Sequence, residues 1–135
     1  METGYIKCSE TNTIEVKLVN GTVWMTANEI ADLFEVSVPT INKNLKELFK
    51  DNLLSENEVT KEYRYTCPKH GECIRIYYNL ELITFLSFRI QSLYTKLFRE
   101  WIFRTIHEQD KKNKIYNAFV MCDLGARAYS QLSLN

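Results

Sequence analysis

Lysines recur along residues 38–50 at a spacing that could bind the phosphate backbone of a nucleic acid. The segment reads Val-Pro-Thr-Ile-Asn-Lys-Asn-Leu-Lys-Glu-Leu-Phe-Lys. At about 100° per residue of an α-helix, its apolar side chains share one face and its lysines the opposite face. Lysine ammonium groups bind phosphates, whereas Thr, Asn and Glu side chains can hydrogen bond to base edges in the major groove. The competing interpretation is an ordinary solvated helix face.

The helical wheel assigns individual roles on this face. The apolar side is centred on Ile41, Leu45, Leu48 and Phe49. The expected DNA contacts of the helix are Thr40, Lys43 and Glu47 at base edges, Lys46 and Lys50 at phosphates, Pro39 beside them, and Asn42 only if the helix docks rotated.

A second candidate for chemistry is the loop Cys67-Pro-Lys-His70-Gly-Glu-Cys73. Structural zinc takes four tetrahedral ligands, usually from two separated pairs, so three ligands in one short loop need a fourth, such as Cys8, from elsewhere. A disulfide between Cys67 and Cys73 is sterically possible but disfavoured in a reducing compartment. We therefore expect no metal and no cofactor.

Catalysis has little support in the sequence. The two histidines, His70 and His107, are far apart, the glycines are isolated, and no pair of acids stands in a recognisable frame. His107, near a predicted helix C-terminus, is better explained by the helix dipole than by a role as a base. We expect a protein that is not an enzyme, with no small-molecule ligand evident.

Two short helices are expected to position the lysine face. Thr26-Ala-Asn-Glu29 is a capping box at the start of the first helix. Ser37 is a good N-cap for the second helix, which runs to about Lys50, and Pro39 is tolerated in its first turn. Two short helices joined by about three residues predict a helix-turn-helix.

Strand patterns flank these helices on both sides. Residues 14–19 and 22–25 surround Asn20-Gly21, a strong signal for a hairpin with a type I′ turn. Residues 59–66 and 74–78 predict a second hairpin with a polar loop over 67–73, which in this context is a wing. The wing residues expected to contact DNA are Arg64, Lys69, His70 and Arg75.

The C-terminal part predicts further helices. Asn79 can cap one helix, and after a break around Gln91-Ser92 a long helix extends to about Gln109. We interpret residues 111–114 as a linker or frayed end and leave residues 115–135 unassigned. The apolar stripe of the long helix is either core or a homodimer interface; the expected interface residues are Leu97, Phe98, Trp101, Ile102 and Ile106.

Composition limits the possible partners. The 135 residues are 45% hydrophobic and carry 17 basic and 17 acidic side chains, so a folded protein with no general attraction to anions is expected. Residues 1–37 hold two basic against six acidic side chains, so an anionic partner is expected at the middle and C-terminal parts. No run is long enough to span a membrane and no signal peptide is visible, which favours a cytoplasmic protein with reduced cysteines.

Residues 27–49 resemble winged helix-turn-helix DNA-binding domains. Ala31 provides the small residue of the first helix, Val36 the aliphatic of the turn, and residues 37–48 follow the S-x-x-T-V-x-x-x-L-x-x-L pattern of bacterial recognition helices. Glu35 departs from this pattern, because many such turns carry Gly; a wider turn or a left-handed Glu35 is needed.

Over residues 13–110 the chain resembles the RhuM family of bacterial proteins, which are related in pattern to phage antirepressor domains. The motifs that carry the resemblance are Ile14-Glu-Val, Val23-Trp-Met-Thr26, Ile30-Ala-x-Leu-Phe34, Ile41-x-Lys43, Leu48-Phe49, Tyr78-Asn-Leu80, Phe88-Arg-Ile-Gln-Ser92 and Phe98-Arg-Glu-Trp101. The chain departs from the family at Ser87-Phe-Arg89, where Gly-Tyr-Arg is usual, at Lys43-Asn44, where a Lys-His pair is usual, and beyond about Asn117. The resemblance implies a DNA-binding-like domain of a bacterial mobile element and no established chemistry.

Together these patterns predict an α+β fold: a winged helix-turn-helix with an N-terminal β-hairpin and a C-terminal helical extension. We expect a DNA-binding-like domain over 1–78, packing or dimerising helices over 79–110, and a linker and tail over 111–135. The expected function is sequence-specific binding of double-stranded DNA by a homodimeric transcriptional regulator or antirepressor-like factor. The alternative is a protein–protein interaction module that acts through the aromatic C-terminal helix.

Overall fold

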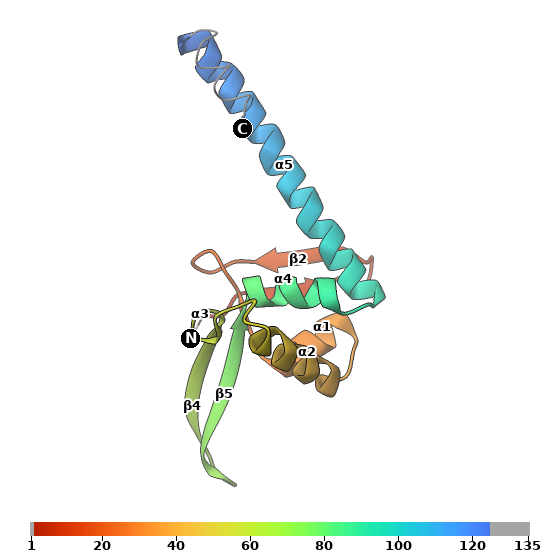
Figure 1. Ribbon diagram of the computed structural model, residues 1–135, viewed down its shortest axis with the longest axis vertical. Helices are drawn as coiled ribbons and strands as arrows, with labels where there is room; N and C mark the ends of the chain where they lie inside the picture. The colour runs from red at the N-terminus through yellow and green to blue at the C-terminus, as the bar shows by residue number, and fades with distance from the viewer. Residues whose placement is uncertain (1, 125–135) are drawn as a thin grey trace. The chain divides into compact units, whose positions relative to one another are not determined.

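The protein has a mixed α+β fold, as the sequence predicts. The computed structural model describes the backbone of residues 2–124 and the side chains of residues 2–113. In this part the chain forms five helices and two small antiparallel sheets (Figure 1). It divides into two compact units, residues 1–99 and residues 100–135.

The elements follow one another in a simple order. The strands are β1 (Tyr5–Cys8), β2 (Ile14–Lys17), β3 (Trp24–Met25), β4 (Thr60–Cys67) and β5 (Gly71–Asn79). The helices are α1 (Ala27–Phe34), α2 (Val38–Lys50), α3 (Glu56–Val59), α4 (Leu80–Arg89) and α5 (Leu93–Leu124). None of the helices in the described residues is long and apolar enough to cross a lipid bilayer.

The α1–turn–α2 unit forms as predicted. The Thr26 hydroxyl accepts a hydrogen bond from the Glu29 amide at 3.2 Å, and the Glu29 carboxylate accepts one from the Thr26 amide at 3.1 Å, which completes the capping box. Glu35 adopts the left-handed conformation, with φ of 51°, so the turn needs no extra residue. Ser37 then caps α2 by accepting from the Thr40 amide at 3.3 Å.

The N-terminal hairpin differs from the prediction. Asn20 and Gly21 do form the tight turn, with φ of 53° and 80°, but only the single bridge between Val19 and Thr22 flanks it. Instead, β2 pairs with β1, and β3 pairs with β5. The alternation of residues identifies strands but not their partners, and β1 had not been expected to be a strand at all.

The second hairpin is confirmed and is longer than expected. Strands β4 and β5 pair from Thr60↔Tyr78 to Cys67↔Gly71, so the strands include both ends of the predicted loop over 67–73. Gly71 closes the connection with φ of 73°, a conformation that favours glycine. The four-residue helix α3 was not predicted, because it spans only about one turn, which is too short for an apolar pattern to repeat.

The core of the first unit is built mainly from apolar side chains of α1, α2 and α4, and the β4–β5 hairpin contributes no buried side chain to it. The residues in its centre are fully buried: Val23, Ile30, Phe34, Ile41, Leu48, Leu82, Ile83, Leu86 and Phe98. The rings of Phe34 and Phe98 lie 5.8 Å apart at a tilted angle of 57°. Phe98 was expected at a dimer interface, and this expectation is wrong, because the side chain is already enclosed by its own chain.

Helix α5 extends further than predicted. It continues through residues 111–114 to Leu124 rather than ending near Gln109. Lysine is a good helix former, and neither Gly nor Pro occurs between residues 93 and 124, so nothing in the sequence stops the helix. The part of the predicted tail over residues 125–135 lies outside the described residues.

Candidate nucleic-acid interface

Helix α2 presents its lysines on an exposed face while its apolar face is fixed in the core. Ile41 and Leu48 are fully buried and Leu45 is 4% exposed. The predicted contact residues on the opposite side are exposed, namely Pro39, Asn42, Lys43, Lys46 and Lys50, and Thr40 is half-buried. The helical wheel therefore places these side chains correctly relative to the core.

The three lysines of α2 have no acidic partner among the residues whose side chains the structure describes. Within residues 2–113, the ion pairs join Lys7 to Glu15, Arg64 to Glu72 and Arg89 to Glu47. None of these pairs includes Lys43, Lys46 or Lys50. The ammonium groups on this helix face are therefore available to phosphates without first breaking a pair within the described part of the chain.

Glu47 is held by a residue that sequence reasoning missed. Its carboxylate accepts a hydrogen bond from the Arg89 guanidinium at 2.5 Å, with side chains 44% and 31% exposed. Arg89 also donates to the Asn44 side-chain oxygen at 3.3 Å, and the Asn44 amide donates to the Thr40 carbonyl at 2.8 Å. A contact between Glu47 and a base would require the base to displace Arg89. Glu47 is therefore better explained as a residue that joins α2 to α4 through its ion pair.

Arg89 could have been anticipated in part. It stands in the last turn of α4, where a basic side chain is favoured by the helix dipole. Its partner, however, lies 42 residues earlier in the chain, and no local pattern encodes a contact at that separation. The pair joins α2 to the last turn of α4, in addition to the contacts of the buried face of α2.

The predicted basic residues of the β4–β5 hairpin do not form one surface. Arg64 and Arg75 point to opposite faces, since their register positions are one step apart: Arg64 pairs with Ile74, and Tyr63 with Arg75. Arg64 forms an exposed ion pair with Glu72 at 3.7 Å. Lys69 and His70 lie in the exposed connection at the hairpin tip.

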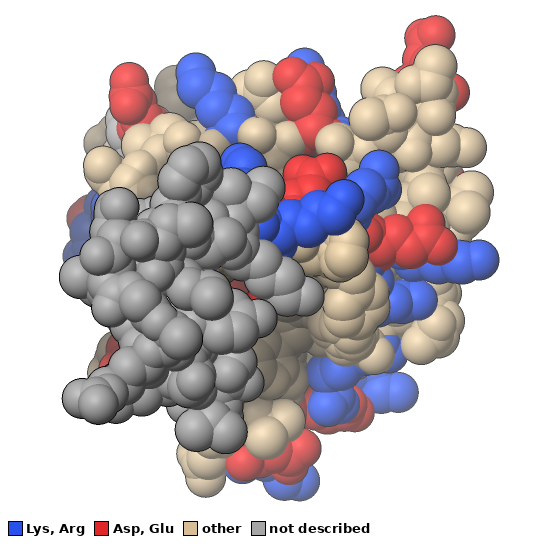
Figure 2. Space-filling view, turned by 90° about the horizontal axis from the view of Figure 1, so that it is seen from above, with Lys and Arg blue, Asp and Glu red and all other residues tan. Residues whose placement is uncertain are grey.

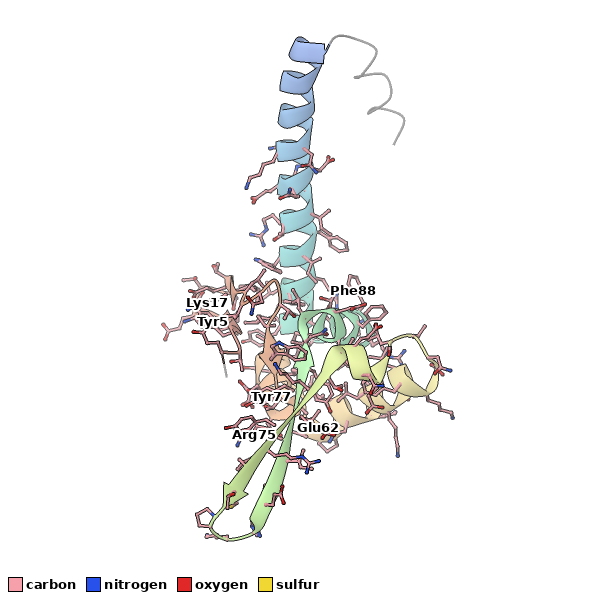
Figure 3. All side chains as sticks on the ribbon, turned by 90° about the vertical axis from the view of Figure 1, so that its left-hand side faces the viewer. Tyr5, Lys17, Glu62, Arg75, Tyr77 and Phe88 are labelled. Carbon is pink, nitrogen blue, oxygen red and sulfur yellow. The ribbon has the colours of Figure 1, made fainter. Side chains whose placement is uncertain are left out.

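Arg75 is set among aromatic rings. Its guanidinium lies 4.8 Å from the centre of the Tyr65 ring, and a hydrogen bond with Tyr77 raises the pKa of Arg75 further above its ordinary value. Figure 3 shows Arg75 and Tyr77 together on one side of the hairpin and Glu62 on the other side. Arg75 is therefore a permanently charged member of an aromatic surface rather than an isolated cation.

The cysteine and histidine side chains at the hairpin tip do not assemble a metal centre. In the described part of the chain, no group of three or more His, Cys, Asp or Glu residues could hold a metal ion. Cys8, Cys67 and Cys73 are free thiols. The backbone amides of Lys69 and His70 lower the pKa of the half-buried Cys67 thiol by hydrogen bonding to its sulfur, and the neighbouring Cys73 adds to the effect.

Acidic side chains gather away from α2. A hollow between β1 and α1 is lined by several of them: Glu10, Glu29, Asp32 and Glu35. In the view of Figure 2, basic and acidic side chains alternate over the visible surface without a large area of one sign. The hollow is also lined by Lys7, and the expectation that an anionic partner binds outside residues 1–37 stays a prediction.

The remaining predicted interface residues belong to α5. Leu97, Trp101 and Ile102 are half-buried, and Ile106 is 60% exposed. Phe103, which was not among the predicted interface residues, is 58% exposed. Residues 101–106 thus include large apolar side chains that water still reaches.

Comparison with known proteins adds no identification. No protein-family model matches the chain, and neither a curated protein nor a solved structure is detectably similar to it. The functional argument therefore depends on the geometry of the chain itself.

Proposed function

We propose that the chain binds double-stranded DNA in a sequence-specific manner, with α2 as the helix that enters the major groove. The observation that carries the proposal is the exposed, unpaired lysine face of α2 on a helix whose opposite face is fully buried. A helix held in one orientation by its core face and by Arg89 can present the same side chains to every site it meets.

The arrangement of elements supports a winged helix-turn-helix. Helices α1 and α2 are separated by the three residues 35–37, both carry side-chain caps, and the β4–β5 hairpin follows them in the chain. In this class of domain the second helix contacts base edges and the hairpin contacts the backbone. The resemblance of residues 13–110 to the RhuM family is part of the same proposal.

The proposed contacts divide into two kinds. Thr40 and Lys43 reach base edges, which carry the sequence information of the major groove. Asn42 reaches a base edge only if the helix docks in a rotated orientation. Lys46 and Lys50 bind phosphates, and the exposed Lys69 and His70 bind the backbone beside the groove. With few phosphate contacts and no net charge on the chain, we expect modest nonspecific affinity.

We further propose that the protein acts as a homodimeric transcriptional regulator or antirepressor-like factor of a bacterial mobile element, in the cytoplasm. The exposed apolar side chains of residues 101–106 support a partner surface, because exposed large hydrophobic groups on a helix are stabilised by association. The second candidate function, a protein-interaction module without DNA binding, uses this same stretch.

The test is the double variant Lys43→Ala with Lys46→Ala. Duplexes that bind the native chain are first selected from a random pool. Fluorescence anisotropy then measures the affinity of the native chain and of the variant for these duplexes at two salt concentrations. We expect the double variant to lose at least about tenfold in affinity at unchanged thermal stability. The matched control, Lys7→Ala with Lys17→Ala, removes the same charge from the β1–β2 hairpin and keeps the affinity within about threefold.

Equal losses in both double variants would show that only net charge matters and would contradict a specific role for α2. No selection of any duplex motif by the native chain would favour the interaction module instead. In that case light scattering on the native chain and on Ile106→Ala tests association through α5.

A further inference from the structure

The β4–β5 hairpin and β3 together form a sheet face that is rich in aromatic and basic side chains. Register assigns its members: Lys61 pairs with Tyr77 and Tyr63 with Arg75, and residues two apart on one strand share a face. Trp24 pairs with Asn79, which places it on the same face at the other end. We call this the aromatic face, made of Trp24, Lys61, Tyr63, Tyr65, Arg75 and Tyr77.

The rings and cations of this face are arranged in contact with one another. The Tyr63 and Tyr65 rings are stacked with 6.4 Å between centres and 16° between planes. Arg75 lies over Tyr65, and the Lys61 ammonium lies 5.4 Å from the centre of the Trp24 ring. Tyr63 remains 44% exposed, so water still reaches a large part of this side chain.

The two faces of the hairpin differ in charge. Glu62 and Glu72 pair with Ile76 and Thr66, and all of these register positions belong to the opposite face. The aromatic face therefore holds two cations and no acid. Met25, which pairs with Tyr78 on the opposite face, is 5% exposed, so the protein core lies behind the sheet and the aromatic face looks outward.

We propose that the aromatic face binds single-stranded nucleic acid, with unpaired bases stacked on Tyr63 and Tyr65 and with Lys61 and Arg75 close to the phosphates. Open aromatic side chains beside cations are how proteins bind single strands without strict sequence preference, because every base has a flat face. A base stacked on Tyr63 covers apolar ring surface that now faces water. The two cations supply the attraction to a polyanion that stacking alone lacks.

The size of the face suits a few nucleotides. From Asn79, opposite Trp24, to Cys73, opposite Tyr65, the β5 strand advances six residues, which is about 20 Å at about 3.3 Å per residue. Lys61, opposite Tyr77, and Arg75, opposite Tyr63, stand between the two ends of this length. A strand that crosses the face thus meets both cations in the middle of its contact.

This proposal goes beyond duplex binding by α2 and uses different residues. A chain with both surfaces could hold a duplex on α2 and a locally unpaired strand on the sheet. Either surface can fail in experiment while the other stands. A peptide rich in proline also stacks on tyrosine rings, but it carries no phosphates for the two cations to attract. Binding of such a peptide is therefore an alternative outcome of the test.

The experiment measures anisotropy of a fluorescein-labelled 12-nucleotide oligothymidine with the full chain at low salt. We expect binding by the native chain and a loss of at least about tenfold in Tyr63→Val with Tyr65→Val, since stacking on two rings is removed. Valine keeps the strand preference, and circular dichroism checks the fold. The matched control, Tyr63→Phe with Tyr65→Phe, keeps the rings and is expected to bind within about threefold of the native chain.

Three outcomes would overturn the proposal. The first two are no oligothymidine binding by the native chain at low salt, and equal oligothymidine binding by the valine variant and the native chain. The third is displacement of the labelled oligonucleotide by a proline-rich peptide at a lower concentration than by unlabelled oligothymidine. The variant Lys43→Ala with Lys46→Ala separates the two proposals. Its oligothymidine affinity stays within about threefold of the native value even if its duplex affinity falls.

Discussion

Helix α2 and the aromatic face both carry cations, but they hold them in different ways. The lysines of α2 have no acidic partner among residues 2–113, whereas Lys61 and Arg75 of the hairpin are seated over the rings of Trp24 and Tyr65. A free ammonium group on a long chain can follow a phosphate. A cation that lies over an aromatic ring is part of a preorganised flat surface. Such a surface favours stacking of a base more than a purely electrostatic contact with a phosphate.

This difference between the two sets of cations shows that the number of basic residues in a segment does not by itself locate a surface for nucleic acid. The sequence placed Arg64 and Arg75 in one footprint, yet the register puts them on opposite faces, and Arg64 is paired with Glu72. What separates the surfaces is the set of neighbours around each cation. The following predictions test that separation, beginning with the largest expected effect.

The first prediction concerns the buried core of the first unit. Phe98→Ala deletes a fully buried ring in contact with Phe34 and is expected to lower the free energy of unfolding by about 3–5 kcal/mol. Thermal or urea unfolding measures the loss. A loss that varied with protein concentration would instead indicate that Phe98 lies at an interface between chains, as the sequence first suggested.

The second prediction compares the salt dependence of the two surfaces. Three phosphate contacts, from Lys46, Lys50 and Lys69, would give duplex binding a slope of about −2.7 in log affinity against log salt, or about a 40-fold loss from 50 to 200 mM. Two contacts on the aromatic face give oligothymidine a slope of about −1.4 and about a sevenfold loss. Anisotropy at four salt concentrations measures both slopes; equal slopes would remove the distinction between the surfaces.

The third prediction concerns the orientation of α2. Arg89→Ala breaks the ion pair with Glu47 and the hydrogen bond to Asn44, and we expect a loss of about 1 kcal/mol in unfolding free energy, reduced by partial exposure of the pair. Duplex affinity should fall and oligothymidine affinity stay constant, because only α2 loses a positioning contact. A double-mutant cycle with Glu47→Gln shows whether the two effects are coupled. Additive effects would contradict a shared role.

The fourth and smallest effect concerns the hairpin tip. Because the backbone amides of Lys69 and His70 lower the pKa of Cys67 in the folded chain, the thiolate forms at lower pH than in the unfolded chain. Alkylation of Cys67 by iodoacetamide should therefore reach its half-maximal rate at lower pH in the folded protein than in urea. Mass spectrometry of the native chain follows the site, with Cys8 as the internal control. A shift to higher pH on folding would contradict the assigned hydrogen bonds.

Local structure was the part that the sequence could predict. The capping box at Thr26, the Ser37 cap, the left-handed Glu35 and the Asn79 cap each depend on residues within four positions of one another, and all are confirmed. The buried face of α2 is confirmed for the same reason. The regular spacing of Ile41, Leu45 and Leu48 already requires it.

Contacts between distant segments could not be predicted. Three such contacts are the pairing of β2 with β1 and of β3 with β5, the enclosure of Phe98, and the Arg89–Glu47 pair. Each joins residues from separate segments, and a periodic pattern within one segment carries no information about its partner. The aromatic face was also missed, although Tyr63 and Tyr65 alternate in the expected way. Its other members come from β3 and β5, and only the register brings them together.

The central claim is that α2 and the aromatic face are two separate binding surfaces for two forms of nucleic acid. Nuclear magnetic resonance titration of the ¹⁵N-labelled chain tests it most directly, first with a selected duplex and then with oligothymidine. We predict that the duplex shifts the amide signals of residues 38–50 and the hairpin tip, and that oligothymidine shifts those of Trp24 and of residues 61–65 and 75–77. Shifts of the same residues by both ligands, or duplex shifts that leave α2 unchanged, would contradict the claim.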